Sequence, residues 1–322
     1  MKFGILQFFS WPERRQALET VYARALQRIE IMDRSGYDAV WLTEHHFSDY
    51  SVCPSIPVMG AYAAARTKNI RIGTGVTLAA FYHPLRLAEE IALLDILSGG
   101  RVNWGAGRGF DAREFRTFAV PMEESQIRFH EAVEIVTRAW TSDRLTYQGK
   151  FFSFDDVEVL PKPLQKPHPP VWMAAGSPEA LQWAASMGHS VLLGPHATHQ
   201  ETGQQWEFYR DRLRANGYSI EGREIPMARL VAIASTDAEA ARVAGEGAKW
   251  LLKTYVDPKR FADRGDPVQR YVDSVVIHGT PERVVGETIR LREEVHLDYL
   301  IGAPLSHETF LSFTDKVLPR LL

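Results

Sequence analysis

The apolar residues of this 322-residue chain change their spacing repeatedly, from runs typical of a buried strand to the three- and four-residue spacing of a helix. The spacing predicts buried strands at residues 2–9, 39–43, 70–78, 101–107, 171–175, 191–194, 227–235 and 297–301. A helical pattern follows each strand; after the first it is formed by Leu18, Tyr22, Ala25, Ile29 and Met32. This alternation favours an α/β fold with parallel strands covered by helices.

Eight strands, each followed by a helix, match the count of a single (β/α)8 barrel, which predicts one domain over residues 1–322. A doubly wound sheet with an appended domain is the alternative. The surplus over a typical barrel of ~250 residues is expected in the βα loops, mainly at residues 110–124, 145–170 and 253–280. The second of these predicts a hairpin with its turn at Gly149, followed by five prolines in PKPLQKPHPP.

Composition excludes several classes of protein. The only cysteine, Cys53, cannot form an internal disulfide and fits a reducing compartment, so we expect a cytoplasmic protein. No apolar run is long enough to span a membrane, and the apolar stretch at the N-terminus is too short for a signal peptide. A net charge of −3 does not suggest nucleic acid or an anionic membrane as a partner.

The second predicted strand ends in the segment Glu44-His45-His46-Phe47. Successive strand residues point to opposite faces, so His45 and His46 are poorly placed to bind one metal ion, whereas Glu44 and His46 share a face. Solvated polar groups at a strand end are the alternative interpretation. A histidine at the mouth of a barrel titrates near neutrality, however, and suits a general acid or base.

Glycines mark the ends of the third and fourth strands. Gly73 and Gly75 in GTGV indicate either a flat ligand against the backbone or packing against a bulky side chain. The run GAGRG resembles a dinucleotide-binding turn, but no amphipathic helix follows it directly, so we reject that interpretation. Arg108 is better read as a cation that approaches a phosphate, with an ordinary surface arginine as the alternative.

The fifth strand runs into Gly176-Ser177-Pro178, where serine can cap a helix that begins with proline. The free N–H groups of such a helix favour an anion, although many helices begin this way without binding one. Together with Arg108 this segment predicts a phosphate site. Several aromatic residues close to the strand ends can wall an apolar pocket: Phe8, Phe9, Trp41, Phe47, Phe81, Tyr82 and Phe110.

The order of these motifs resembles the flavin-dependent luciferase-like monooxygenases. The similarity runs through GYDAVWLTEHHF, IGTGVTL, HPLRLAEEIALLDILSGGR and GRGFDAREFRTFA, and it continues with PVWMAAGS and GTPE in the second half. It therefore extends over nearly the whole chain.

The resemblance implies a TIM barrel that binds reduced FMN (FMNH2) at its carboxyl-terminal mouth and holds no metal. It implies that His45 is the catalytic base and that Glu44 is the carboxylate beside the flavin. It places Gly75–Val76 at a cis peptide against the ring system, and Arg108 with Gly176–Ser177 at the phosphate.

The chain departs from luciferase at some of these positions. Gly107 stands where luciferase has a cysteine, and Gln126 stands where it has a second arginine near the phosphate, a role that Arg128 could take. The segment 255–278 is also shorter than the luciferase lid. These departures speak against light emission and against a long-chain aldehyde substrate.

The resulting hypothesis is a two-component monooxygenase. A separate flavin reductase would supply FMNH2, O2 would give a flavin C4a-peroxide, and one oxygen atom would enter a small apolar organic substrate. The family also implies a homodimer, through the helices predicted at 54–66 and 84–97. Two alternatives remain: an F420-dependent hydride-transfer enzyme, and a non-catalytic flavin-binding protein on the same fold.

Overall fold

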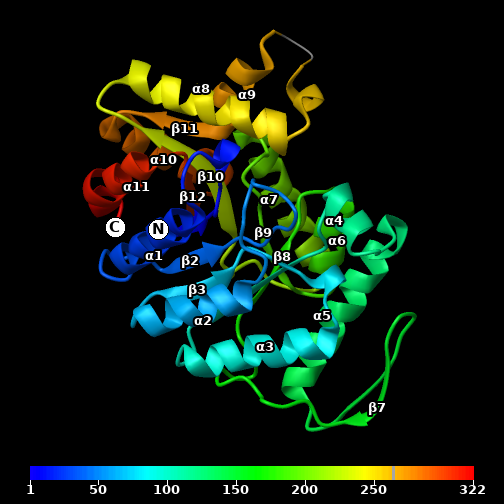
Figure 1. The fold of residues 1–322 in the computed structure, drawn as a ribbon. Helices are drawn as coiled ribbons and strands as arrows, with labels where there is room; N and C mark the ends of the chain where they lie inside the picture. The colour runs from blue at the N-terminus through cyan, green and yellow to red at the C-terminus, as the bar shows by residue number, and fades with distance from the viewer. Residues whose placement is uncertain (263–264) are drawn as a thin grey trace. The chain divides into compact units, whose positions relative to one another are not determined.

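The computed structural model describes residues 1–262 and 265–322. Residues 263 and 264, inside the predicted loop 253–280, lie outside the described residues. The chain forms two compact units, one of residues 1–8, 34–39 and 175–322 and the other of residues 9–33 and 40–174. Figure 1 shows the helices and strands of both units. Within the described ranges, no helix combines the length and apolar character needed to cross a bilayer.

The first unit is built on parallel strands: β1 (Lys2–Gln7), β9 (Ser190–Leu192), β10 (Pro226–Ile233), β11 (Val276–Gly279) and β12 (Tyr299–Pro304). β12 lies between β1 and β10, and its Ile301 pairs with Gly4 on one side and Ala228 on the other. These three strands are buried along almost their whole length, as parallel strands covered by helices must be. The helices are α6 (Pro178–Ser186), α7 (His199–Ala215), α8 (Asp237–Thr254), α9 (Pro267–Val275), α10 (Pro281–Val295) and α11 (His307–Ser312).

The second unit contains β3 (Arg71–Thr74), β4 (Thr77–Leu78), β5 (Val102–Gly107) and β8 (Val171–Ala174), together with Val40–Leu42 of β2 (Ala39–Leu42). β3 and β8 flank β5, and β4 continues beside β5 where β3 ends. Its core is rich in tryptophan: the rings of Trp41 and Trp172 meet edge to face, as do those of Trp104 and Trp140. The helices are α1 (Leu18–Met32), α2 (Ile56–Arg66), α3 (Pro84–Leu97), α4 (Ala112–Thr117) and α5 (Ser125–Thr141).

The predicted hairpin of the second unit is confirmed as β6 (Leu145–Gln148) and β7 (Ser153–Val157), with Gly149 in the turn. The Glu131 carboxylate on α5 accepts hydrogen bonds from the backbone N–H groups of Lys150, Phe151 and Phe152, and thereby fastens the turn to the helix.

All eight predicted strands are present, and the α/β class is confirmed; the third strand breaks between Thr74 and Thr77 into β3 and β4. Two of the predicted loops need correction, because they contain regular elements. Residues 110–124 hold α4, which begins where the Asp111 side chain accepts from the Arg113 N–H. The described part of 253–280 holds α9 and β11. With only six residues, α4 is too short for a periodic apolar pattern to reveal it.

Candidate functional site

The predicted residues of the second unit follow consecutive parallel strands. Glu44, His45 and His46 come after β2, Gly75–Val76 separates β3 from β4, and Arg108 comes after β5. Because the carboxyl ends of parallel strands meet at one edge of a sheet, these residues gather in one part of this unit. Gly176 and Ser177 belong to the first unit, at the start of α6.

Glu44 is completely removed from solvent and is fully hydrogen-bonded. Its carboxylate accepts from the Tyr82 hydroxyl at 2.8 Å, lies 3.3 Å from His46 Nε2 and accepts from the Leu78 N–H at 3.4 Å. The contact with His46 confirms that these two side chains share a face. Burial raises the pKa of Glu44, and the hydrogen bonds from His46 and Tyr82 oppose this rise.

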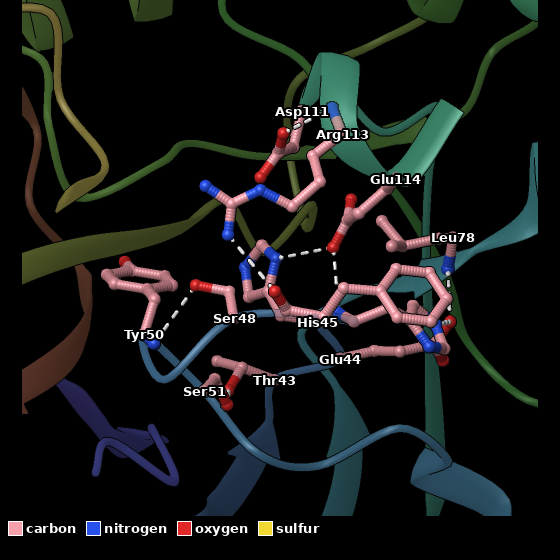
Figure 2. A network of polar contacts seen from close by, with 12 residues as sticks. Thr43, Glu44, His45, Ser48, Tyr50, Ser51, Leu78, Asp111, Arg113 and Glu114 are labelled. Atoms are coloured by element: carbon pink, nitrogen blue, oxygen red, sulfur yellow. Dashed lines mark hydrogen bonds and ion pairs between the residues drawn. The ribbon is translucent and has the colours of Figure 1, made fainter. Parts of the chain in front are cut away.

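His45 points away from this pair and meets a different carboxylate, as Figure 2 shows. Its Nδ1 atom lies 3.2 Å from Oε1 of Glu114, a residue of α4 with 1% of its side chain exposed. The same oxygen accepts from the His46 N–H at 2.9 Å. Each histidine of the motif therefore has its own buried glutamate, and the two rings do not converge on one metal position.

The break between β3 and β4 is a cis peptide bond between Gly75 and Val76, as the resemblance implies. The Gly75 N–H donates to the Leu42 carbonyl at 2.7 Å. A side chain at Gly107 would come within 2.5 Å of Val76 Cγ2, so the position where luciferase has a cysteine is filled here by valine.

Gly73 settles an alternative that the sequence leaves open. A Cβ atom at this position would lie 2.5 Å from the indole ring of Trp41, which is completely buried. This glycine therefore makes room for a tryptophan of the core.

Arg108 has a partner without charge. Its Nη1 donates to the Ser125 hydroxyl at 3.0 Å, at the first residue of α5. No carboxylate of the described residues forms an ion pair with this guanidinium. A cation that is held in place but not neutralised suits a phosphate, and so the donor set of this unit fits the phosphate of FMN.

Arg128 and Gln126 are engaged elsewhere. The Arg128 guanidinium pairs with Glu124 at 2.8 Å and lies over the ring of Phe151, 4.0 Å from its centre. Gln126 contacts His130, and burial lowers the pKa of that histidine to about 4. The position of Arg128 thus gives no support to its proposed role as a second phosphate ligand.

In the first unit, Ser177 caps α6 as expected. Its hydroxyl accepts from the Ala180 N–H at 3.3 Å, and Pro178 follows at the first helical position. The Gly176 carbonyl accepts from the Gln205 side chain of α7 at 2.9 Å. These contacts are those of a capped helix and agree equally with the anion site and with the plain helix start.

The aromatic residues near these strand ends differ in exposure. Phe9 and Trp41 are completely buried core residues, whereas Phe47 and Phe110 are about half exposed. Intermediate exposure is found for Phe8, Phe81 and Tyr82. Phe118 of the loop after β5 contacts the rings of His46 and Phe47. Cys53 is buried, which raises the pKa of its thiol to about 12 and keeps it protonated at neutral pH.

Two residues of this cluster do not follow from the sequence pattern. The sequence predicts Tyr82 only as an aromatic wall of the pocket, yet its hydroxyl donates to Glu44. Glu114 lies in a segment predicted as a loop, and its one local signal is an acidic residue close after the glycine turn. Among the described residues, no group of three or more His, Cys, Asp or Glu side chains could hold a metal ion.

Comparison with known proteins identifies what the chain is similar to. The family model for luciferase-like monooxygenases matches residues 1–297. An uncharacterized protein of Sinorhizobium fredii is 39% identical over 61% of this chain, and the chain spans 57% of that relative's length. The oxygenase component of a flavin-dependent trigonelline monooxygenase from Acinetobacter baylyi is 29% identical over 76% of this chain and 69% of that protein.

Solved structures agree with these relatives. The monooxygenase RslO1 from Streptomyces bottropensis superposes with a TM-score of 0.88, 30% identity and full coverage of both chains. The oxygenating constituent of 3,6-diketocamphane monooxygenase from Pseudomonas putida, in complex with FMN, reaches 0.85 at 20% identity, covering 100% of this chain and 99% of that one. A coenzyme F420-dependent tetrahydromethanopterin reductase from Methanopyrus kandleri has a TM-score of 0.80 at 18% identity, covering 100% of this chain and 99% of that one. The last two show the shared fold, the TIM barrel that the strand count predicts.

Proposed function

The chain belongs to the luciferase-like monooxygenase family, and on that basis we propose that it is the oxygenase component of a two-component monooxygenase. It would use reduced FMN and O2 to insert one oxygen atom into a small apolar organic substrate. A relative that is the oxygenase component of a flavin-dependent trigonelline monooxygenase supports the proposal.

We propose that Glu44, Gly75, Val76 and Arg108 of the second unit bind the flavin. For Gly176 and Ser177 of the first unit, a contact with the phosphate stays a prediction from the resemblance. When bound, reduced FMN would supply the activation of O2 and the oxygen atom that is transferred. Arg108 would hold the phosphate, because its hydrogen bond to the neutral Ser125 hydroxyl leaves the positive charge of the guanidinium uncompensated. Glu44, which is locked to Tyr82 and His46, would present a buried polar group beside the ring system.

His45 would move the proton that the reaction requires. Its side chain is 11% exposed, so the imidazole is largely shielded from water but still reachable. The ring of Phe118 contacts those of Phe47 and Phe81, and these apolar side chains would limit access of water to the flavin. The observation that carries the proposal is the pairing of both motif histidines with buried carboxylates.

Replacing His45 by alanine tests this assignment. We expect substrate oxygenation to fall by roughly a hundred- to ten-thousandfold, the usual contribution of a positioned acid or base. FMN binding, followed by fluorescence titration, should persist. Product formation at the wild-type rate would reject His45 as the base.

A second candidate, F420-dependent hydride transfer, is favoured only by the shared fold of the F420 enzymes. Spectra recorded with reduced FMN and with F420 would separate the two. A non-catalytic flavin-binding protein would not need two carboxylate–histidine pairs, which speaks against it. Flavin binding without any oxygen-dependent turnover across ketone, aldehyde and aromatic substrates would revive it.

We further propose two protein partners and a location. A separate reductase would supply the reduced flavin, as the term "oxygenase component" implies for the Acinetobacter relative. A second copy of the chain would cover α2 and α3, which pack against each other and expose Val58, Tyr62, Leu93 and Leu97 by 48% to 72%. The cytoplasmic location stays a prediction from the single cysteine, and the single domain stays a prediction from the strand count.

A further inference from the structure

Glu114 is paired with His45, but the proposed function does not say what this carboxylate does. It is 1% exposed, and it reaches the end of β2 from α4, far along the chain from the histidines it contacts. A buried carboxylate is costly unless it is fully hydrogen-bonded, so its contacts indicate what it does.

Glu114 contacts both histidines through the same oxygen. The His46 backbone N–H can only donate, so Oε1 accepts there at 2.9 Å. His45 Nδ1 lies 3.2 Å from this oxygen. With Oε1 acting as the acceptor in both contacts, Nδ1 carries a proton. In a neutral imidazole the lone pair then lies on Nε2.

The helix that carries Glu114 is itself anchored to the motif. The Asp111 side chain caps α4, and Arg113 Nη1 donates to the Phe47 carbonyl at 3.0 Å. Figure 2 shows Arg113 and Glu114 on the same side of His45. His45 also contacts the rings of Tyr50 and Phe110, with 5.0 Å and 6.4 Å between the ring centroids. Glu114 is thus a buried carboxylate in direct contact with the His45 ring.

We propose that Glu114 is the positioning residue of His45: its carboxylate holds the ring and keeps the proton on Nδ1, so that Nε2 accepts the proton in the reaction. During that step Nε2 gains a proton from the reacting group, Nδ1 keeps its own, and the carboxylate offsets the charge that develops on the ring. The catalytic part of this role rests on the proposed function. The tautomer does not, because it depends only on the folded chain.

Nitrogen-15 NMR of the histidine rings tests the tautomer without any flavin. Long-range proton–nitrogen spectra of ring-labelled protein distinguish a proton on Nδ1 from one on Nε2, and the His45→Gln variant assigns the signal. Three variants are compared: Glu114→Met, which fills the space without an acceptor; Glu114→Gln, which retains an acceptor oxygen; and Arg116→Met, an exposed control on the same helix.

In the wild type we expect the Nδ1–H tautomer. Glu114→Met should shift the proton toward Nε2 and lower kcat roughly ten- to a hundredfold with a smaller change in KM, which is part of the ~10²–10⁴-fold that a positioned base supplies. Glu114→Gln should restore the tautomer and much of kcat, and Arg116→Met should match the wild type in both.

A wild-type protein with the proton on Nε2 would overturn the proposal, and so would an unchanged tautomer in Glu114→Met. If Glu114→Met does not fold, the tautomer seen in the wild-type spectrum tests the proposal by itself. The expected tautomers combined with an absence of oxygenase activity would reject the proposed function and leave the role of Glu114 in holding His45 intact.

Discussion

At the scale of single residues, two glutamates removed from water organise the end of β2. Glu44 contacts the side chain of His46. Glu114 contacts the side chain of His45 and accepts a hydrogen bond from the backbone N–H of His46. Neighbouring histidines on an extended segment point in opposite directions, so one carboxylate could not serve both rings. The motif therefore needs a second acid from elsewhere in the chain.

Arg108→Gln tests the phosphate site at this scale. A hydrogen bond to a charged group contributes about 1.5–3 kcal/mol, so we expect the Kd for FMN to rise roughly ten- to a hundredfold. Riboflavin lacks the phosphate and serves as the control ligand, whose Kd should not change. Fluorescence titration of both ligands gives the comparison, and an equal loss for both would contradict the assignment.

His199→Gln tests a buried histidine of the first unit. Burial lowers the pKa of His199 to about 3, and the charge of Arg229 adds to this effect. Between pH 6.5, the usual pKa of histidine, and pH 3, the unfolded chain binds a proton that the folded chain refuses. The free energy of unfolding therefore decreases as the pH is lowered through this range, by up to about 1.4 kcal/mol per pH unit.

The variant lacks this titration, so its free energy of unfolding should rise relative to the wild type as the pH is lowered from 7 to 5. Urea unfolding at pH 7, 6 and 5 measures the difference, and the pH 7 value is the internal reference. Parallel pH profiles for the two proteins would contradict the assignment.

At the scale of elements, the long strands and helices are readable from spacing, whereas the short ones depend on caps. α3 and α7 begin and end where their apolar patterns indicate. α4 has six residues and is set by its Asp111 cap and by the contacts of Glu114, none of which has a periodic signature. The element that carries the second acid is thus one that periodicity cannot detect.

Gly73→Ala and Gly245→Ala form a matched pair that tests how elements use glycine. At Gly73 the new methyl group would press on the Trp41 ring, and we expect a loss of about 1–3 kcal/mol from overpacking. Gly245 lies inside α8 with nothing within 4 Å of the added atom. There alanine should stabilise by about 0.5–1 kcal/mol through helix propensity. Thermal or urea unfolding measures both, and equal effects would reject the packing argument.

At the scale of the whole molecule, the proposed dimer explains why α2 and α3 expose large apolar side chains. Val58 is 72% exposed and Leu97 60%, although each belongs to a helix whose opposite side is buried. Surfaces of this kind usually meet a partner. The reductase and the substrate would bind only transiently and would not cover a surface permanently. We therefore assign the exposed apolar side chains of α2 and α3 to the contact with a second copy of the chain.

The double variant Val58→Lys, Leu97→Lys should dissociate the dimer. Uncompensated charges inside an interface cost several kcal/mol, so we expect the Kd of dimerisation to rise roughly a hundredfold or more. Light scattering after size-exclusion chromatography measures the mass. Ile289→Lys, on the exposed side of α10, is the control that should keep the wild-type mass. A monomeric wild type would reject the interface outright.

Periodicity and turn chemistry are local properties, so they predict the α/β class, the eight strands, the hairpin and the place of Glu44, His45 and Arg108 at strand ends. Which groups meet is a property of the folded chain: Glu114 contacts His45, Tyr82 contacts Glu44, Ser125 contacts Arg108 and Trp41 packs on Gly73. These pairs join distant segments, and their formation depends on how α4, α5 and the strands pack. No local pattern records that packing, so the partner of the proposed base had to come from the folded chain.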